Sequence, residues 1–165
     1  MLTLGIDPGT AICGYGLVET QGSRLTAIQY GAITTVPQLS PAQRLEIIYN
    51  ELDAIIKRYR PDCMGVEELF FNKNVRTAMA VGQARGVILL VASQNKVPIE
   101  EYTPLQVKQS VVGYGKATKE QVTFMTQRLL NLTDKPKPDD VADALAVAIC
   151  TSHSVGYNQI WGAGR

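Results

Sequence analysis

Cysteine and histidine are both scarce in this chain. Its 165 residues include three cysteines, Cys13, Cys63 and Cys150, and one histidine, His153. The cysteines are far apart and odd in number, and no CxxC pair is present, which disfavours a disulfide framework and a zinc site. We interpret them as reduced packing residues of a cytoplasmic protein. A single histidine near the end of a helix is typical of a surface position, so we assign His153 no catalytic role.

Long hydrophobic runs are also missing. The longest apolar stretch, "GVILLVA" at residues 86–92, is too short to cross a bilayer, and the first residues, "MLTLGID", lack the basic segment of a signal peptide. With 45% hydrophobic and 19% charged residues, the composition is typical of a globular protein with one sizeable core. We therefore expect a single domain with no membrane partner.

The overall charge is nearly balanced, with a formal net charge of +1, but it is unevenly distributed. Residues 71–137 hold ten Lys or Arg against four acids, whereas the remainder holds six against eleven. This split predicts a basic surface beside an acidic one, and a basic surface suits a polyanionic partner. Ordinary solvated helix faces would explain the same charges equally well.

Apolar periodicity and turn residues predict the element order β-β-β-α-β-α-β-α-α-α. Ser40 and Pro41 fit the start of a helix over 40–60, and Thr118 with Gln121 forms the capping box of a later helix. The expected strands are 2–6, 12–20, 23–35, 62–69 and 97–102, and the other expected helices are 74–95, 103–112 and 140–153.

This order predicts an α/β fold with a mixed five-stranded sheet, in which three antiparallel strands are followed by parallel βα units flanked by helices. We expect the domain to span residues 1–154. Residues 155–165 then form a flexible C-terminal tail.

Several carboxylates fall where such a sheet would bring them together. Asp7 ends the first strand, and Glu67 and Glu68 end the fourth. If these strands are parallel neighbours, their carboxyl ends share one edge of the sheet. Asp140 and Asp143 are three residues apart in the first turn of the last helix and share a face. Because like charges at close range repel, and all-oxygen donors suit Mg²⁺ or Mn²⁺, the pattern predicts a two-metal site for phosphodiester hydrolysis.

Each carboxylate taken alone has a simpler explanation. Asp7 before Pro-Gly is a common turn residue, and Glu67 at a strand end is often a solvated charge. Asp139 and Asp140 suit the start of a helix through capping and the helix dipole. Asp143 is harder to explain in this way because "VADALAVAI" is otherwise an apolar helix.

Five stretches of the chain match the motifs of one family: "GIDPGT..GYG", "VEELFFNKN", "GQARGV", "QVKQSVVGYGKATK" and "DDVADALA". Over about residues 2–150 the chain resembles the RuvC family of bacterial Holliday junction resolvases, which has the RNase H-like fold. The resemblance implies catalytic, metal-binding carboxylates at Asp7, Glu67, Asp140 and Asp143. The pattern [IV]-E-x-x-F selects Glu67, and D-x-x-D-A-x-A selects Asp140.

The implied activity is resolution of four-way DNA junctions by paired symmetric nicks during homologous recombination and repair. The implied cofactor is Mg²⁺, two ions per site, with Mn²⁺ as a substitute. The resemblance also implies cooperation with the RuvA–RuvB branch-migration complex.

A further group of residues is predicted to hold the DNA. By the resemblance, Lys108 and Lys119 are catalytic residues near the scissile phosphate, and Phe70 stacks on an unpaired base near the crossover. For Lys116, a phosphate contact and an ordinary surface lysine both stay open. The predicted DNA-binding residues are Phe70, Lys73, Arg76, Lys108, Lys116 and Lys119.

Small residues in "TAMAVGQARGVILLVA" would allow close helix approach, with Gly82 and Gly86 four residues apart. Tight packing within one chain would explain them, but the equivalent helix of the family forms a dimer interface. Because a two-fold junction cut on two strands calls for two sites related by a two-fold axis, we predict a homodimer with Gly82 and Gly86 at the interface.

Three other functions fit parts of the sequence. "GIDPGTAICGYG" also resembles the first phosphate motif of sugar kinases and actin-like ATPases, but those chains carry the motif in two domains and this one has a single copy. A junction-binding module that does not cut would not need four carboxylates beside DNA phosphate. An RNase H-like nuclease acting on RNA would share the first Asp, but we would not expect "VEELFFNKN" and "QVKQ" there.

Overall fold

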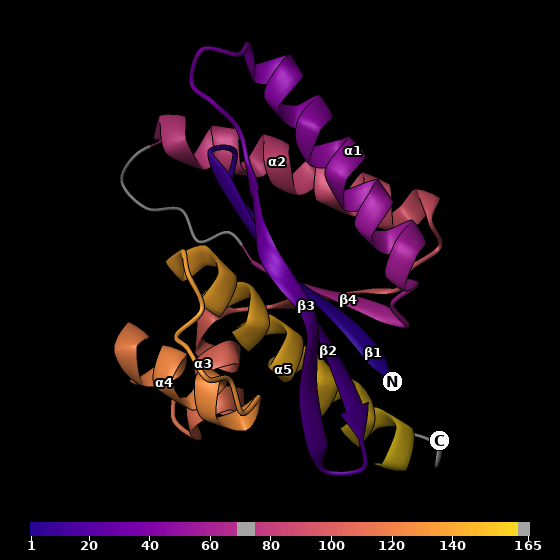
Figure 1. Cartoon of the computed structure of the whole chain (residues 1–165), viewed down its shortest axis with the longest axis vertical. Coiled ribbons are helices and arrows are strands. Elements are labelled where there is room, and N and C mark those ends of the chain that lie inside the picture. The colour runs from indigo at the N-terminus through magenta and orange to yellow at the C-terminus, as the bar shows by residue number, and fades with distance from the viewer. Residues whose placement is uncertain (69–74, 162–165) are drawn as a thin grey trace.

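A computed structural model describes residues 1–68 and 75–161 of the chain and gives the element order predicted from the sequence. Figure 1 shows the arrangement of these elements. The strands are β1 (Leu2–Asp7), β2 (Ile12–Gln21), β3 (Arg24–Thr34), β4 (Cys63–Glu67) and β5 (Ile99–Tyr102). The helices are α1 (Pro41–Tyr59), α2 (Val75–Gln94), α3 (Pro104–Val112), α4 (Lys119–Leu129) and α5 (Asp139–Trp161).

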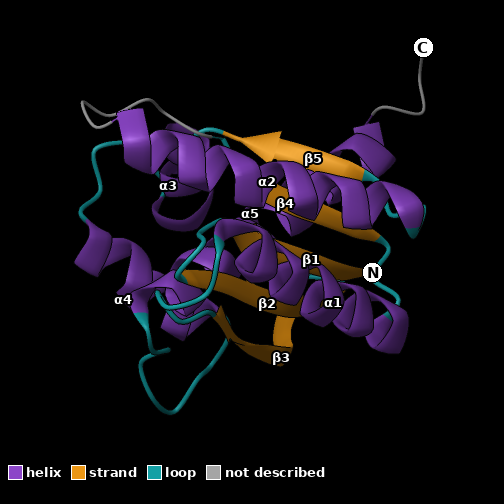
Figure 2. Ribbon diagram, turned by 90° about the horizontal axis from the view of Figure 1, so that it is seen from above, coloured by secondary structure: helices purple, strands orange, loops and turns teal. Residues whose placement is uncertain are grey.

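The five strands form one mixed sheet in the order β3-β2-β1-β4-β5 (Figure 2). The β1–β2 and β2–β3 pairs are antiparallel, whereas β1–β4 and β4–β5 are parallel. The expected meander followed by parallel βα units is therefore confirmed. Since β1 lies at the centre, its carboxyl end is flanked by β2 on one side and β4 on the other.

Helices cover both faces of the sheet, with α1 and α2 on one side and α3, α4 and α5 on the other (Figure 1). Ile48 and Leu52 of α1 and Ile88 of α2 pack with Leu4 and Ile6 of β1 in the first core. The second core is built mainly from α5, whose residues from Val141 to Cys150 are buried apart from Asp143. A charged residue on so buried a helix needs a polar environment, and the sheet edge supplies one.

Glycines on the three central strands let α5 lie directly on the sheet. A Cβ atom at Gly5 of β1 would collide with the backbone of Ala144, and one at Gly14 of β2 would collide with the backbone of Asp140. At Gly65 of β4 it would collide with α5 side chains. Only residues without a Cβ permit this spacing, which fixes the height of the first turn of α5 above the sheet edge.

The last helix is longer than the sequence predicted. We expected the helix to end at residue 153 and a flexible tail over 155–165, but α5 continues to Trp161. The segment "SVGYNQIW" contains no proline and carries only one glycine, so nothing in it forces the helix to end earlier. Among the described residues, no helix has the length and apolar character needed to cross a membrane.

Candidate active site at the carboxyl edge of the sheet

Asp7 and Glu67 occupy equivalent positions on two parallel strands. Ile6 of β1 pairs with Val66 of β4 in the parallel register, so the residues that follow, Asp7 and Glu67, lie at the same edge of the sheet. Both side chains are half-buried. The sequence argument depended on β1 and β4 being parallel neighbours, and the register confirms that they are.

The first turn of α5 brings two more carboxylates to this edge. Asp140 lies over β2, where its backbone carbonyl packs against Gly14, the residue that pairs with Asp7 in the β1–β2 register. Asp143 lies almost one turn further along, and its charge acts on both Asp7 and Glu67. The four carboxylates predicted from the sequence therefore come from three separate elements to one region.

Burial and mutual repulsion both act on Asp7. Loss of hydration raises the pKa of Asp7 from 3.8 to about 8, and the nearby charges of Asp143, Glu67 and Asp140 raise it further in that direction. Lys119 opposes them by lowering the Asp7 pKa. A carboxylate this poorly hydrated and this close to other anions demands a cation.

Glu67 and Asp143 are affected in the same direction. Burial is the main cause that raises the pKa of Glu67, followed by the charge of Asp143, while Lys119 and Lys108 lower it. Burial also raises the pKa of Asp143, against the effect of its hydrogen bond from Lys119. The protein itself supplies two lysines toward this excess of negative charge.

Lys119 is the cation closest to the carboxylates. Thr118 caps α4 through a capping box with Gln121, so Lys119 is the first residue of that helix. Its Nζ lies 2.9 Å from Oδ2 of Asp143 and 3.7 Å from Oδ2 of Asp139. The hydrogen bond to Asp143 is the main cause that raises the pKa of Lys119, which keeps the side chain charged.

Lys108 and Lys119 both line a cavity of about 230 Å³ beside the carboxylates. Val107, Val122 and Ala146 form its apolar part. Its other lining residues are Glu67, Pro104 and Asp143. The cavity thus combines two acids with two lysines, an arrangement that can hold a cation and an anionic group side by side.

The donor set fits divalent cations of the magnesium class. Asp7, Glu67, Asp140 and Asp143 offer only carboxylate oxygens, which Mg²⁺ and Mn²⁺ prefer over softer ligands. Over residues 1–68 and 75–161, no three His, Cys, Asp or Glu side chains already stand in a metal-ligating arrangement. Asp143 instead directs an oxygen to Lys119, so binding a cation requires this ion pair to rearrange.

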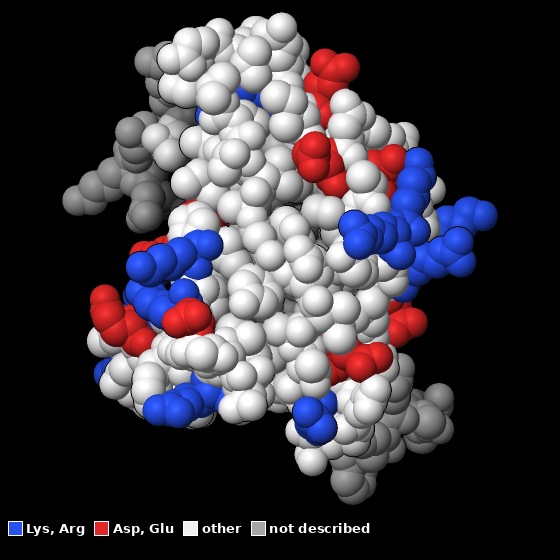
Figure 3. All heavy atoms as spheres, in the orientation of Figure 1, with Lys and Arg blue, Asp and Glu red and all other residues white. Residues whose placement is uncertain are grey.

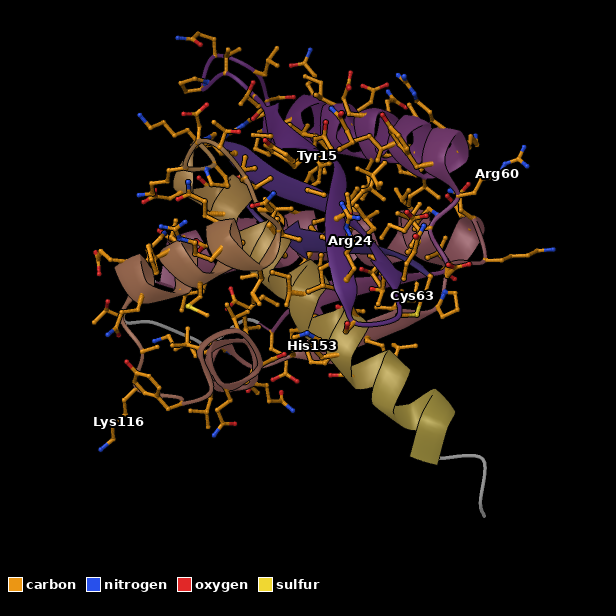
Figure 4. All side chains as sticks on the ribbon, turned by 60° about the horizontal axis from the view of Figure 1, so that its bottom comes forward. Tyr15, Arg24, Arg60, Cys63, Lys116 and His153 are labelled. Carbon is orange, nitrogen blue, oxygen red and sulfur yellow. The ribbon has the colours of Figure 1, made fainter. Side chains whose placement is uncertain are left out.

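The other predicted residues fall into two groups. Phe70 and Lys73 lie outside the described residues, and Arg76 belongs to α2, although its side chain also lies outside the described part. Lys116 is exposed on the α3–α4 connection, and Figure 4 shows it pointing away from the body of the molecule. Lys108 and Lys119 are therefore the predicted DNA-binding residues that the structure brings to the carboxylates.

Helix α2 carries the two glycines predicted at a dimer interface. Gly86 is exposed, with open space where a Cβ would stand, and Gly82 is half-buried. Met79 and Leu90 are large exposed hydrophobic residues spaced four and seven positions from Gly86 or nearly so along the same face, at 64% and 51% exposure.

The sequence analysis missed the contribution of Gly14 and Asp139. The alternating glycines of "CGYG" were a usable signal, because glycines two apart on one strand lie on one face and suit close helix packing. Asp139 was considered only as a residue favourable at a helix start. Its contact with Lys119 joins two elements that are twenty residues apart, which local sequence patterns do not reveal.

Comparison with known proteins agrees with this geometry. The family profile described as "Crossover junction endodeoxyribonuclease RuvC" matches residues 3–151. A protein of that name from Heliobacterium modesticaldum is 61% identical over 157 residues, covering 95% of this chain and 97% of that protein. One from Halothermothrix orenii is 57% identical over 162 residues, covering 98% of both chains.

Solved structures give the same result. The structure described as "T. thermophilus RuvC in complex with Holliday junction substrate" has a TM-score of 0.90 and 35% identity, covering 94% of both chains. The "Thermus thermophilus RuvC structure" has a TM-score of 0.87 at the same identity, covering 97% of this chain and 96% of that one. The predicted RNase H-like fold is thereby confirmed. The chain belongs to the RuvC family of crossover junction endodeoxyribonucleases.

Proposed function

We propose that this protein is a structure-specific endonuclease that resolves four-way DNA junctions by paired symmetric nicks, in homologous recombination and repair. The observation that carries the proposal is the meeting of carboxylates from β1, β4 and α5 with two lysines at one edge of the sheet. A relative with the same fold at 35% identity is described in complex with a Holliday junction substrate, which supports the choice of DNA.

The proposed chemistry is hydrolysis of a phosphodiester at the carboxylate cluster. Asp7, Glu67, Asp140 and Asp143 would hold two Mg²⁺ ions, with Mn²⁺ as a substitute. When bound, such a pair activates a water and stabilises the leaving oxygen. Asp7 is held by the central strand and cannot follow the substrate, so it fixes where the reaction occurs. Its poor hydration strengthens its attraction for a cation.

Lys108 and Lys119 would act on the scissile phosphate. Both line the cavity next to Glu67 and Asp143, so a phosphate there lies within reach of two ammonium groups. Their charge offsets the negative charge that grows on the phosphate oxygens in the transition state. Further DNA contacts at Lys116, Lys73 and Arg76, and base stacking by Phe70, remain predictions from the sequence and the family resemblance.

A homodimer would place two such sites on one junction. The face of α2 with Met79, Gln83, Gly86 and Leu90 is exposed, and two copies of a helix with a glycine at its centre can approach closely. We assign this face, with Gly82 beside it, to the interface. Cooperation with RuvA–RuvB rests on the family resemblance, and we assign no surface to it.

The direct test is cleavage of a synthetic four-way junction with each strand labelled in turn, in Mg²⁺. Symmetric nicks on two opposing strands, leaving ends that ligase can rejoin, would support the proposal. Binding without nicks in both Mg²⁺ and Mn²⁺ would favour a junction-binding module. Preferential cleavage of a matched RNA substrate would favour an RNA nuclease.

A further inference from the structure

Asp139 bridges two lysines at the edge of the candidate active site. It is the first residue of α5, directly before the proposed metal ligand Asp140. Its Oδ2 lies 3.7 Å from Nζ of Lys119, and its Oδ1 lies 3.5 Å from Nζ of Lys135 in the connection between α4 and α5. Figure 3 shows basic and acidic side chains intermixed over α4 and this connection. One carboxylate therefore links the start of α4 to the start of α5.

Asp143 has two roles that compete with each other. Its Oδ2 lies 2.9 Å from Nζ of Lys119, yet the proposed function requires the same carboxylate to bind a cation. A carboxylate that holds a divalent ion attracts a lysine less, because part of its charge is already neutralised. Among the described residues, the other carboxylate within 4 Å of Lys119 is Asp139.

We propose that Asp139 is a positioning residue, which keeps Lys119 directed at the cavity when Asp143 binds a cation. This inference rests on the proposed function, since it concerns how Lys119 stays available for the scissile phosphate. Lys135 contributes by holding the second oxygen of Asp139, which leaves the first oxygen turned toward Lys119. Asp139 itself touches neither the phosphate nor the cation.

A simpler role for Asp139 would be electrostatic support of the helix. An acidic residue in the first turn of α5 stabilises that helix through its dipole, whatever stands at position 119. The two roles make different predictions. Helix support affects the free energy of unfolding independently of Lys119, whereas positioning affects the cleavage rate only when Lys119 is present.

A double-mutant cycle separates these roles. We would measure single-turnover cleavage of a saturating four-way junction in Mg²⁺ for the wild type, Asp139→Asn, Lys119→Gln and the double variant. Asn keeps the shape and the suitability for a helix start but removes the charge. We expect Asp139→Asn to lower the rate about fivefold, the upper range for an exposed ion pair, and to have no further effect in Lys119→Gln. Asp134→Asn, which removes an exposed acid from the same connection, should leave the rate unchanged.

Nitrogen NMR of the lysine side chains gives a readout that does not need cleavage. In Mg²⁺, Asp139→Asn should shift the Nζ signal of Lys119, and Asp134→Asn should not. Equal rate losses from Asp139→Asn with and without Lys119, or an unchanged Lys119 signal, would overturn the inference. If the wild type fails to cut while the Lys119 signal still responds to Asp139→Asn, the proposed function fails and the pairing stands.

Discussion

Nζ of Lys119 lies 2.9 Å from Oδ2 of Asp143, so a cation from the start of α4 faces the carboxylates that β1, β4 and α5 bring together. This contact neutralises part of a cluster whose members raise one another's pKa values. It also shows where additional positive charge is needed. The following predictions concern that need, the second lysine, the helix proposed at the dimer interface and the central carboxylate.

Without divalent cations, the stability of the protein should fall as the pH rises from about 4 to about 8. The pKa of Asp7 is raised from 3.8 to about 8, so in this window the folded state holds a proton that the unfolded state releases. The free energy of unfolding is therefore greatest below pH 4 and is lost as Asp7 ionises. Calorimetry in EDTA should show a Tm for Asp7→Asn above that of the wild type at pH 8, by about 2–4 °C per kcal/mol relieved. A wild-type Tm that rises across this pH range relative to Asp7→Asn would contradict the account.

Mg²⁺ should raise the Tm of the wild-type protein. A ligand that binds the folded state at a hundredfold excess over its Kd stabilises it by about 2.7 kcal/mol. The effect should be larger at pH 8 than at pH 5, because protons compete for Asp7 at the lower pH. Thermal unfolding across a Mg²⁺ titration measures it, with Asp7→Asn as the matched control that should respond less. A Tm that Mg²⁺ does not change would argue against the convergence of these carboxylates on a cation site.

Lys108→Gln should lower the cleavage rate about 100-fold and leave junction affinity within a few-fold. Lys108 lines the cavity beside Glu67, and loss of one preorganised donor to a developing anion has a cost of this size. Lys116→Gln is the control, since Lys116 lies on the surface away from that cavity. It should leave the rate unchanged and reduce the salt dependence of binding by about one counterion. Rate losses of equal size in the two variants would remove the distinction between the lysines.

Leu90→Glu should shift the protein from dimer to monomer. Leu90 is 51% exposed on the face of α2 assigned to the interface, and a charge buried between two copies is costly. Sedimentation velocity at micromolar concentration measures the change. Val36→Glu is the control, because Val36 is similarly exposed, at 54%, in the segment after β3. A dimer that survives Leu90→Glu would place the interface elsewhere.

The sequence was informative where local patterns determine structure. Apolar periodicity and capping residues located all ten elements, and the position of Asp7 and Glu67 at strand ends led to their shared edge. It was less informative where contacts join distant parts of the chain. The packing of α5 on Gly14 and the ion pair between Lys119 and Asp139 depend on tertiary structure, and no spacing rule connects those positions.

The most direct test of the account is the effect of Asp7→Asn on cleavage of a labelled four-way junction. In Mg²⁺, the wild type should nick two opposing strands, while Asp7→Asn should bind the junction with similar affinity and cut it at least 100-fold more slowly. Its circular dichroism spectrum should match that of the wild type, which excludes misfolding as the cause. Cleavage by Asp7→Asn at the wild-type rate would contradict the claim that the carboxylates at this sheet edge perform the reaction.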